Sequence, residues 1–311
     1  MQPHYPNSRA IWRAARDVAK TQARVRNIDS GLLIRGFVFD RFLARVFALP
    51  GDQWVLKGGN AVLTRVHDAR TTKDLDLLAE LEDLDAAVEQ LRAATLIDLY
   101  DHFRFAITDI KELPGAQQPG VAGCRVSLDA YCGATHRQKL GIDVVTGSLM
   151  TTEADVLERP PLLPAVPGPK VRLYPTVDHI ADKVAATQSM YGAGGDKPSS
   201  RVRDLVDLVV FANTQVTEGD KLQTAIAAEW THRGLPEKPF FKPPEHWENL
   251  YPLIAAKTTA CNGVTRYSDA ADLIDRFLAP ALSGTASGLE WVPQTHTWIA
   301  SIPTPEGVGR C

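Results

Sequence analysis

The chain has 311 residues, of which 44% are hydrophobic and 23% charged, and its formal net charge is −3. This composition excludes a disordered chain and predicts a globular protein with room for two domains. A nearly neutral charge gives no overall sign of nucleic-acid binding, so a phosphate-rich partner would have to meet a local basic surface. Reduced thiols are expected, because neither a CxxC pair nor zinc-ligand spacing occurs among Cys124, Cys132, Cys261 and Cys311.

The first ten residues, MQPHYPNSRA, lack the apolar stretch of a signal peptide. No run in the chain reaches the roughly 18 consecutive apolar residues of a membrane span. We therefore expect a cytoplasmic, monomeric protein without a membrane partner.

Two helices are predicted before residue 50. The apolar positions of residues 8–27 follow one helical face, interrupted only by Gln22, and comprise Ile11, Ala15, Val18 and Val25. The opposite face is basic and carries Arg9, Arg13, Arg16, Lys20 and Arg24. A basic face of this kind could follow an RNA backbone or simply be solvated. Residues 31–49 are apolar almost all round, which predicts a buried helix beneath a sheet.

Short β-like runs follow at 53–57, 74–79, 103–110, 124–132 and 139–145, and helical patterns separate the first three. This order predicts an α+β fold with a mixed sheet. Five prolines in residues 151–170 exclude a helix interior or a central strand there, so we expect a domain boundary after residue 150. The remainder reads as mainly helical, with residues 283–311 as an extended tail.

Gly58 and Gly59, in the string VLKGGNAVL, follow a predicted strand and precede a predicted helix. At such a turn the N–H groups of the helix N-terminus face any bound anion, which suits a triphosphate. A glycine pair at this kind of junction is also a common tight turn, so both interpretations stay open.

Asp74 and Asp76, in the string RTTKDLDLL, lie two residues apart at the start of a strand. The strand period of two puts both carboxylates on one face and Leu75 and Leu77 on the other. Paired carboxylates repel each other unless a cation offsets their charge, and their oxygens are the ligands that Mg²⁺ prefers. A solvated pair at an exposed strand start is the alternative.

Asp143 is the single charge in the apolar run LGIDVV, where it would be costly to bury without a partner. If its strand lies beside the strand of Asp74 and Asp76, three carboxylates converge. Such a set can hold two divalent ions and deprotonate an attacking hydroxyl. An edge position that faces water is the other possibility.

Lys183 lies among small residues of a predicted helix, from which its ammonium could reach a phosphate or remain solvated. In the next predicted helix, Arg203 and Asp207 are four residues apart, which predicts an ordinary surface ion pair. Asp204 lies beside them.

Five strings occur in order along the chain: KGGNA, RTTKDLDLL, GIDVVTG, DKVAA and RVRDLVDL. Together they resemble the AbiEii toxin family of nucleotidyltransferases, which belongs to the DNA-polymerase-β-like superfamily and includes the MenT toxins. The resemblance spans residues 54–211. It implies a polymerase-β-like core with a mixed β-sheet flanked by helices in residues 1–150, and a mainly helical C-terminal domain in residues 151–311 that contributes Lys183 and Asp204.

The resemblance also assigns roles. The positions that it assigns to nucleotide binding are Gly58, Gly59, Asn60, Arg70, Thr72 and Lys183. The positions that it assigns to metal binding are Asp74, Asp76 and Asp143, and the catalytic set consists of these three with Lys183 and Asp204. Asn60 stands where the superfamily usually has a hydroxyl residue, so the preferred base does not carry over. Thr72 matches a position that the resemblance links to regulation by phosphorylation, although a threonine that only starts a strand is the better explanation.

The implied activity is transfer of nucleotides from an NTP to an RNA acceptor, the tRNA 3′ end, with Mg²⁺ or Mn²⁺ as cofactor. Such a toxin would block translation and have a cognate antitoxin. The same carboxylate site could instead modify a hydroxyl of a protein or a small molecule. A catalytically inactive binding or antitoxin-like module is a further alternative, against which the three acids and Lys183 speak.

Overall fold

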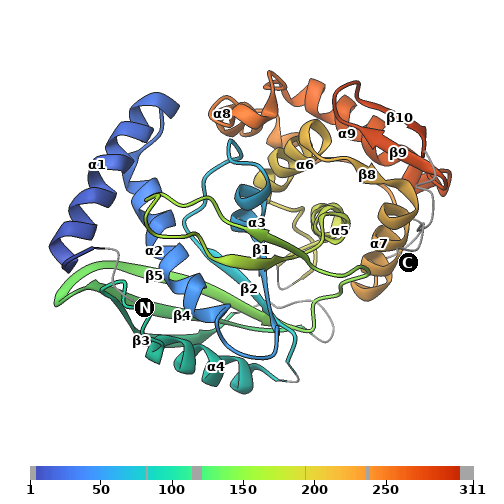
Figure 1. The fold of residues 1–311 in the computed structure, drawn as a ribbon. Coiled ribbons are helices and arrows are strands. Elements are labelled where there is room, and N and C mark those ends of the chain that lie inside the picture. The colour runs from blue at the N-terminus through green and yellow to red at the C-terminus, as the bar shows by residue number, and fades with distance from the viewer. Residues whose placement is uncertain (1–4, 82, 114–120, 193, 236–238, 302–311) are drawn as a thin grey trace, which may run out of the picture. The chain divides into compact units, whose positions relative to one another are not determined.

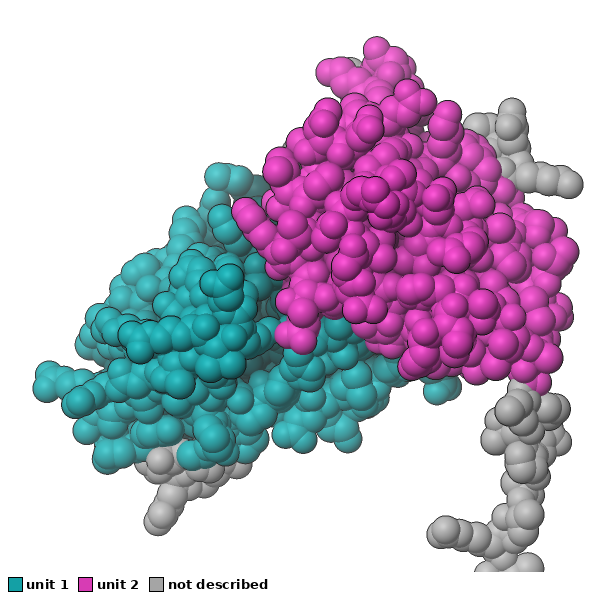
Figure 2. Space-filling model, turned by 90° about the horizontal axis from the view of Figure 1, so that it is seen from above, with its two compact units in different colours: residues 1–67, 71–175 teal, residues 68–70, 176–311 magenta. Residues whose placement is uncertain are grey.

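The computed structural model describes residues 5–81, 83–113, 121–192, 194–235 and 239–301. The chain forms two compact units, coloured separately in Figure 2: residues 1–67 with 71–175, and residues 68–70 with 176–311. Each unit has its own sheet and its own helices, so each is described by itself.

The first unit is built on a mixed seven-stranded sheet with the order β3-β4-β5-β2-β1-β7-β6 (Figure 1). Its strands are β1 (Trp54–Lys57), β2 (Leu75–Ala79), β3 (Phe103–Glu112), β4 (Ala122–Cys132), β5 (Thr135–Thr146), β6 (Asp155–Glu158) and β7 (Lys170–Leu173). Its helices are α1 (Ser8–Arg26), α2 (Ser30–Val46), α3 (Gly58–Arg65) and α4 (Leu84–Leu96). The pairs β2–β5 and β1–β7 are parallel and the other neighbours antiparallel, which confirms the predicted mixed sheet.

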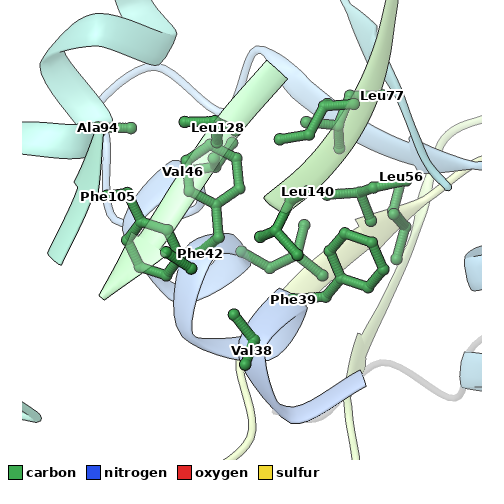
Figure 3. Packing of buried hydrophobic residues seen from close by; sticks show 14 of the residues in the cluster. Val38, Phe39, Phe42, Val46, Leu56, Leu77, Ala94, Phe105, Leu128 and Leu140 are labelled. Carbon is green, nitrogen blue, oxygen red and sulfur yellow. The ribbon is translucent and has the colours of Figure 1, made fainter. Parts of the chain in front are cut away.

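Apolar side chains of α2 pack against one face of this sheet (Figure 3). From the helix come Val38, Phe39, Phe42 and Val46, and from four strands come Leu56, Leu77, Leu128 and Leu140. Because side chains alternate along a strand, the intervening residues of these strands face the other side of the sheet. Asp76, next to Leu77, is one of them.

The buried face of α1 differs from the predicted one. Its buried residues are Ile11, Ala15, Ala19 and Ala23, spaced by four. Val25, which the sequence placed on this face, is 82% exposed, so that part of the prediction is wrong. The alanine row is the buried one because its small side chains let α1 approach α2 closely, whereas residue 25 falls outside this row. The basic side chains are all exposed, as predicted: Arg9, Arg13, Arg16, Lys20 and Arg24.

The first unit continues beyond residue 150. Strands β6 and β7 extend its sheet, and Leu173 of β7 lies opposite Leu56 of β1. The contacts divide the chain after Pro175, whereas the sequence placed the boundary after residue 150. The reason is that prolines exclude regular structure only where they stand, and the proline-rich residues 159–169 merely connect two short strands.

The second unit is mainly helical, as predicted. Its helical segments are α5 (Thr176–Gln188), α6 (Val202–Thr214), α7 (Gly219–His232), η1 (Glu245–Trp247), α8 (Tyr251–Ala255), η2 (Thr259–Cys261) and α9 (Tyr267–Ser283). Its sheet has the order β10-β9-β8, formed by β8 (Thr217–Glu218), β9 (Leu289–Val292) and β10 (Thr297–Ala300). Two of these segments, η1 and α8, are short pieces separated by a turn at residues 248–250.

The C-terminal segment is a hairpin rather than the predicted extended tail. Strands β9 and β10 pair, with Trp298 opposite Trp291. Trp291 is fully buried, packs with its ring centre 5.0 Å from that of Phe277, and donates its indole N–H to the carbonyl of Ala212 at 2.7 Å. Burial of this aromatic side chain anchors the hairpin. Residues 302–311 of the predicted tail lie outside the described residues.

Within the described residues, no helix is both long enough and apolar enough to cross a membrane. Cys124, Cys132 and Cys261 are buried free thiols, and Cys311 lies outside the described part. Burial raises the pKa of Cys132 to about 11 and that of Cys261 to about 12, so both stay protonated at neutral pH.

Candidate functional site

Asp76 and Asp143 meet at the centre of the first unit's sheet. Strands β2 and β5 are parallel neighbours, and Asp76 lies opposite Asp143 in their register. Residues opposite each other on adjacent strands point to the same face, so the two carboxylates share the face that α2 does not cover. Asp74 immediately precedes β2 and lies two residues from Asp76. The neighbouring strands that the sequence analysis required for the three acids are thus present.

Gly58 opens α3 and lies directly against Asp76. Its φ of +60° is in the left-handed region, which glycine tolerates and other residues rarely adopt. A Cβ at this position would also collide with Oδ2 of Asp76. Gly59 has little room for a side chain for a different reason: a Cβ added there would lie 3.0 Å from Cβ of Thr72. The glycine pair therefore sets the N-terminus of α3 beside the carboxylates.

Asn60 and Thr72 fix the start of the acidic strand. Asn60 is buried, and its Nδ2 donates to the carbonyl of Asp74 at 2.8 Å. The hydroxyl of Thr72 donates to the same carbonyl at 3.3 Å. The sequence analysis gave the Asn60 amide to a phosphate, whereas in the structure it positions the backbone of Asp74. Both side chains connect the glycine turn to the carboxylates.

Arg125 is a residue of this site that sequence reasoning missed. It lies opposite Asp143 in the β4–β5 register, and its guanidinium hydrogen-bonds Asp74 and lies 3.5 Å from Oδ1 of Asp143. Gly141 makes this reach possible, since a Cβ there would lie 2.7 Å from Nη2 of Arg125. The signal was available in the regular alternation of residues 124–130, which puts Arg125 with Ser127 and Asp129 on the face opposite Cys124.

A divalent cation is the ligand that this set of groups suits. Oδ1 of Asp143 is buried and has no hydrogen-bond partner, and burial raises the pKa of Asp143, with Arg125 opposing and Asp74 adding to the shift. Carboxylate oxygens are the donors that Mg²⁺ prefers. Among the described residues, no three Asp, Glu, His or Cys side chains lie close enough together to hold a metal ion in this structure. Arg125 contacts both Asp74 and Asp143. The acids have the right donor atoms for a divalent cation, but they could bind one together only after Arg125 leaves this position.

Lys57 also belongs to this face of the sheet. It lies opposite Asp76 in the β1–β2 register, so its side chain leaves the sheet on the same side. Its ammonium donates to the hydroxyl of Ser148 at 3.0 Å and lies 4.0 Å from the ring centre of Tyr174. The strand period of VLKGG could have identified Lys57, which the sequence analysis passed over.

Lys183 is buried between two carboxylates of the second unit. Helix α5 supplies Lys183, and α6 supplies Asp204 and Asp207, one helical turn apart. The ammonium donates to Asp204 at 3.0 Å and to Asp207 at 2.7 Å, and Lys183 is 3% exposed. Burial lowers the pKa of Lys183, but the two carboxylates outweigh it and hold the pKa above its ordinary value. The lysine is therefore a charged member of an internal ion-pair cluster.

Asp207 pairs with Arg70 and not with Arg203. The guanidinium of Arg70 donates to both oxygens of Asp207, at 2.8 and 2.7 Å, in a bidentate arrangement. The predicted surface pair with Arg203 is wrong, because α6 turns Asp207 into the interior while Arg203 stays exposed. Arg70, which the sequence analysis assigned to the nucleotide, is engaged in this cluster.

The predicted site residues thus fall into two groups. The first unit carries Gly58, Gly59, Asn60, Thr72, Asp74, Asp76 and Asp143. The second unit carries Arg70, Lys183 and Asp204. The catalytic and binding role of each residue stays a prediction.

We expect Gly58→Ala to destabilise the protein more than Gly234→Ala. Gly234 has nearly the same φ, +61°, but a Cβ there meets nothing within 4 Å, so it reports the backbone strain alone. The added collision with Asp76 should cost about 1–3 kcal/mol beyond that strain. Urea unfolding of both variants measures the difference. Equal losses in the free energy of unfolding would show that the close approach of Asp76 to Gly58 does not require a glycine.

We expect Lys183→Met to lower the free energy of unfolding at pH 7 by about 3–5 kcal/mol, because it leaves two buried carboxylates with one cation fewer. Lys257→Met, at an exposed site of the same unit, should change it by less than about 0.5 kcal/mol. Urea unfolding measures both variants, and equal losses would contradict a buried ion-pair role.

The pH dependence should change in the same variant. Burial alone would raise the pKa of Asp204, but Lys183 and Arg201 outweigh it and hold the pKa below its ordinary value. The stability that Asp204 contributes is therefore present above its unfolded pKa of about 4 and is lost as the pH falls through its folded pKa. Without Lys183 the folded pKa rises, so the variant should lose less stability on acidification than the wild type. Urea unfolding at a series of pH values measures this. If the variant and the wild type lose the same free energy of unfolding as the pH falls, Lys183 does not set the pKa of Asp204.

The family model described as nucleotidyl transferase AbiEii toxin, type IV toxin–antitoxin system, matches residues 41–275. No curated protein sequence matches the chain. Among solved structures, the chain is similar to MenT4, a nucleotidyltransferase toxin from Mycobacterium tuberculosis H37Rv, with 15% identity, a TM-score of 0.51, and coverage of 88% of this chain and 99% of that one. JHP933 from Helicobacter pylori is similar at 14% identity and a TM-score of 0.42, with coverage of 82% of this chain and 97% of that one.

The likeness to MenT4 shows a shared nucleotidyltransferase fold, in agreement with the mixed sheet and the glycine turn beside Asp76. The family match spans more than half of the chain and includes all the predicted catalytic, metal-binding and nucleotide-binding residues, from Gly58 to Asp204. The chain therefore belongs to the AbiEii family of nucleotidyltransferase toxins of type IV toxin–antitoxin systems.

Proposed function

We propose that this toxin transfers a nucleotide from an NTP to the 3′ end of tRNA, with Mg²⁺ as cofactor, and thereby blocks translation. The observation that carries the proposal is the register of Asp76 and Asp143 on parallel neighbouring strands, with the N-terminus of α3 at Gly58 directly beside them. This geometry combines acidic metal ligands with a phosphate-binding helix end. A cognate antitoxin, as expected for this family, would restrain the activity.

The phosphate chain of the NTP would lie at the start of α3. There the N–H groups following Gly58 are not yet used by the helix and face an anion. The cofactor would be held by Asp76, Asp143 and Asp74, and when bound it neutralises the phosphates and the leaving group. Arg125 stabilises the acids before substrate binds, and its guanidinium would then be released to pair with a phosphate.

We assign Asp143 as the acceptor of the proton that the attacking hydroxyl loses. Burial already raises its pKa above that of an ordinary carboxylate, which makes it a better proton acceptor. Asn60 and Thr72 would keep Asp74 in place through its carbonyl while the ligands rearrange. The acceptor hydroxyl attacks the α-phosphate, its proton passes to Asp143, and pyrophosphate leaves.

Lys183 is the residue of the second unit that we assign to phosphate binding. An ammonium has three N–H donors, and the bonds to Asp204 and Asp207 use two of them. The third N–H would donate to a phosphate oxygen. Asp204 would keep Lys183 charged and oriented, which agrees with the raised pKa of the lysine.

The exposed basic face of α1 would bind the backbone of the RNA acceptor. Phosphate contacts need only aligned positive charge, so a protein of net charge −3 can still supply them. The face runs along the helix through Arg9, Arg13, Arg16, Lys20 and Arg24. Arg13 lies 3.8 Å from Asp17, and both side chains of that pair are exposed.

We expect Asp76→Ala to reduce nucleotide transfer at least ~100-fold, because it removes a ligand that offsets phosphate charge. Labelled NTPs incubated with total tRNA and, separately, with tRNA-depleted lysate measure transfer and identify the acceptor. Thermal unfolding should stay nearly unchanged, since Asp76 is half-exposed. Wild-type transfer by the variant would refute the metal-ligand role, and label on protein or small molecules instead of tRNA would refute the proposed acceptor.

We expect replacement of Arg9, Arg16 and Arg24 by glutamine to weaken tRNA binding and to make it less steeply dependent on salt, because fewer counterions are released. Fluorescence anisotropy over a series of KCl concentrations measures the slope. A triple variant at the exposed residues Lys221, Lys242 and Arg276 removes the same charge elsewhere and should leave the slope unchanged. Identical slopes for wild type and the α1 variant would mean that the face is only solvated.

A further inference from the structure

Three planar side chains form a row across three neighbouring strands of the first unit's sheet. Arg104 of β3 lies opposite Tyr131 of β4, and Tyr131 lies opposite His136 of β5. The guanidinium carbon of Arg104 is 5.0 Å from the ring centre of Tyr131, and the ring centres of Tyr131 and His136 are 5.4 Å apart, edge to face. Aromatic rings and guanidinium planes are the groups on which unpaired bases stack. We call Arg104, Tyr131 and His136 the planar row.

The planar row lies on the face of the sheet that carries the acids. Phe105, next to Arg104, is buried among the side chains that pack against α2 (Figure 3). Side chains alternate along a strand, so Arg104 points to the opposite face. Burial alternates along β4 from residue 124 to residue 132, which puts Tyr131 on the same face as Arg125. Arg125 contacts Asp74 and Asp143 there, so row and acids share one surface.

Small and charged side chains separate the planar row from Arg125. The strand registers give two intervening rows, the first with Ala106, Asp129 and Lys139 and the second with Asp109, Ser127 and Gly141. No large apolar side chain is among these six residues. Arg104 and Lys139 are exposed, and the side chain of His136 is 49% exposed. A flat ligand can therefore lie along this strip.

The charge of this surface suits a phosphate backbone. Apart from the acids of the site, its cations are Arg104, Lys111, Arg125 and Lys139, and its acids are Asp109 and Asp129. Asp109 is 3.0 Å from the ammonium of Lys111, and Asp129 is 3.2 Å from the ring of His136. The excess of positive charge is small, so we expect stacking to provide more of the affinity than charge does.

The length of the strip fits a short single strand. Tyr131 and Arg125 are six residues apart on β4, which corresponds to about 20 Å. About six stacked nucleotides, at about 3.4 Å each, or fewer extended ones, span this distance. A strand whose terminal hydroxyl lies at Asp143 would thus place a nucleotide a few positions upstream on Tyr131.

The planar row also adjoins the start of the basic helix. The thiol of Cys132 donates to the carbonyl of Ser8, the first residue of α1, at 3.4 Å. Tyr131 precedes Cys132, and Arg9, the first residue of the exposed basic face, follows Ser8. The two surfaces therefore meet at the β4–β5 turn. A polyanion bound along α1 can continue over this turn onto the sheet.

Resting on the proposed function, we propose that this sheet face binds the unpaired 3′ strand of the RNA acceptor, with one base stacked on the planar row. The ligand is a single strand, because the bases of a duplex are already stacked on each other and do not present their ring faces. The planar row is then a positioning site that directs the 3′ hydroxyl toward Asp143. It is separate from the triphosphate site at Gly58.

Tyr131→Ala and Tyr131→Leu test the assignment, since both remove the ring and leucine keeps much of the apolar volume. The probes are a 5′-labelled tRNA and the same tRNA with abasic sugars at its unpaired 3′ nucleotides, with affinity measured by fluorescence anisotropy. Both variants should bind intact tRNA about tenfold more weakly than wild type, as expected for one stacked base, and bind the abasic tRNA as wild type does. The salt dependence should stay unchanged, because stacking releases no counterions.

Two control variants should keep wild-type affinity for intact tRNA. Tyr131→Phe retains the ring, and Phe240→Ala removes an exposed aromatic side chain from the second unit. Thermal unfolding of each variant verifies the fold, and thermal protection by NTP, which should not change, verifies the triphosphate site.

Wild-type affinity of both ring-removing variants for intact tRNA would overturn the proposal. Equal losses for the intact and the abasic probe would overturn it too, because the ring would then not contact a base. If wild type transfers no nucleotide to tRNA but shows the base-dependent loss at Tyr131, the proposed function fails and the assignment of the sheet face stands. If transfer to tRNA occurs and the loss does not, the assignment fails and the proposed function stands.

Discussion

Electrostatic repulsion among three carboxylates on one sheet face is the constraint on which the first unit's site depends. The pairing of β2 with β5 holds Asp76 opposite Asp143 although their like charges repel each other. Arg125 offsets part of this repulsion by bridging Asp74 and Asp143, and Gly141 leaves the room that it needs. Holding like charges together costs stability unless a positive group offsets them, and here that group is the guanidinium of Arg125.

The second unit solves a different electrostatic problem. Lys183 and Asp207 are almost completely buried, where an unpaired charge would be very costly. Arg70 and Arg201 complete the cluster, so every charge in it has an opposite neighbour. The same pairing that stabilises the unit holds the lysine charged, and a charged lysine is what a phosphate-binding role requires. Structural and functional roles therefore need not exclude each other at this residue.

The glycines make the link between fold and chemistry concrete. Gly58 admits Asp76 to the N-terminus of α3, and Gly141 admits Arg125 to the acids. In each case the missing side chain creates a space that a neighbouring group or a ligand can use. This arrangement agrees with membership of the AbiEii family of nucleotidyltransferases.

The sequence by itself determined most elements and the chemical character of the site. Alternation in RTTKDLDLL separated Asp74 and Asp76 from the leucines, and the glycine pair marked the turn before α3. Only the tertiary structure decided that Arg125 neutralises the acids, that Asp207 turns inward to Arg70, and that β6 and β7 join the first unit. The physical reason is that periodicity reports which face of an element a residue occupies. Strand neighbours and ion partners are set by contacts between segments far apart in the chain.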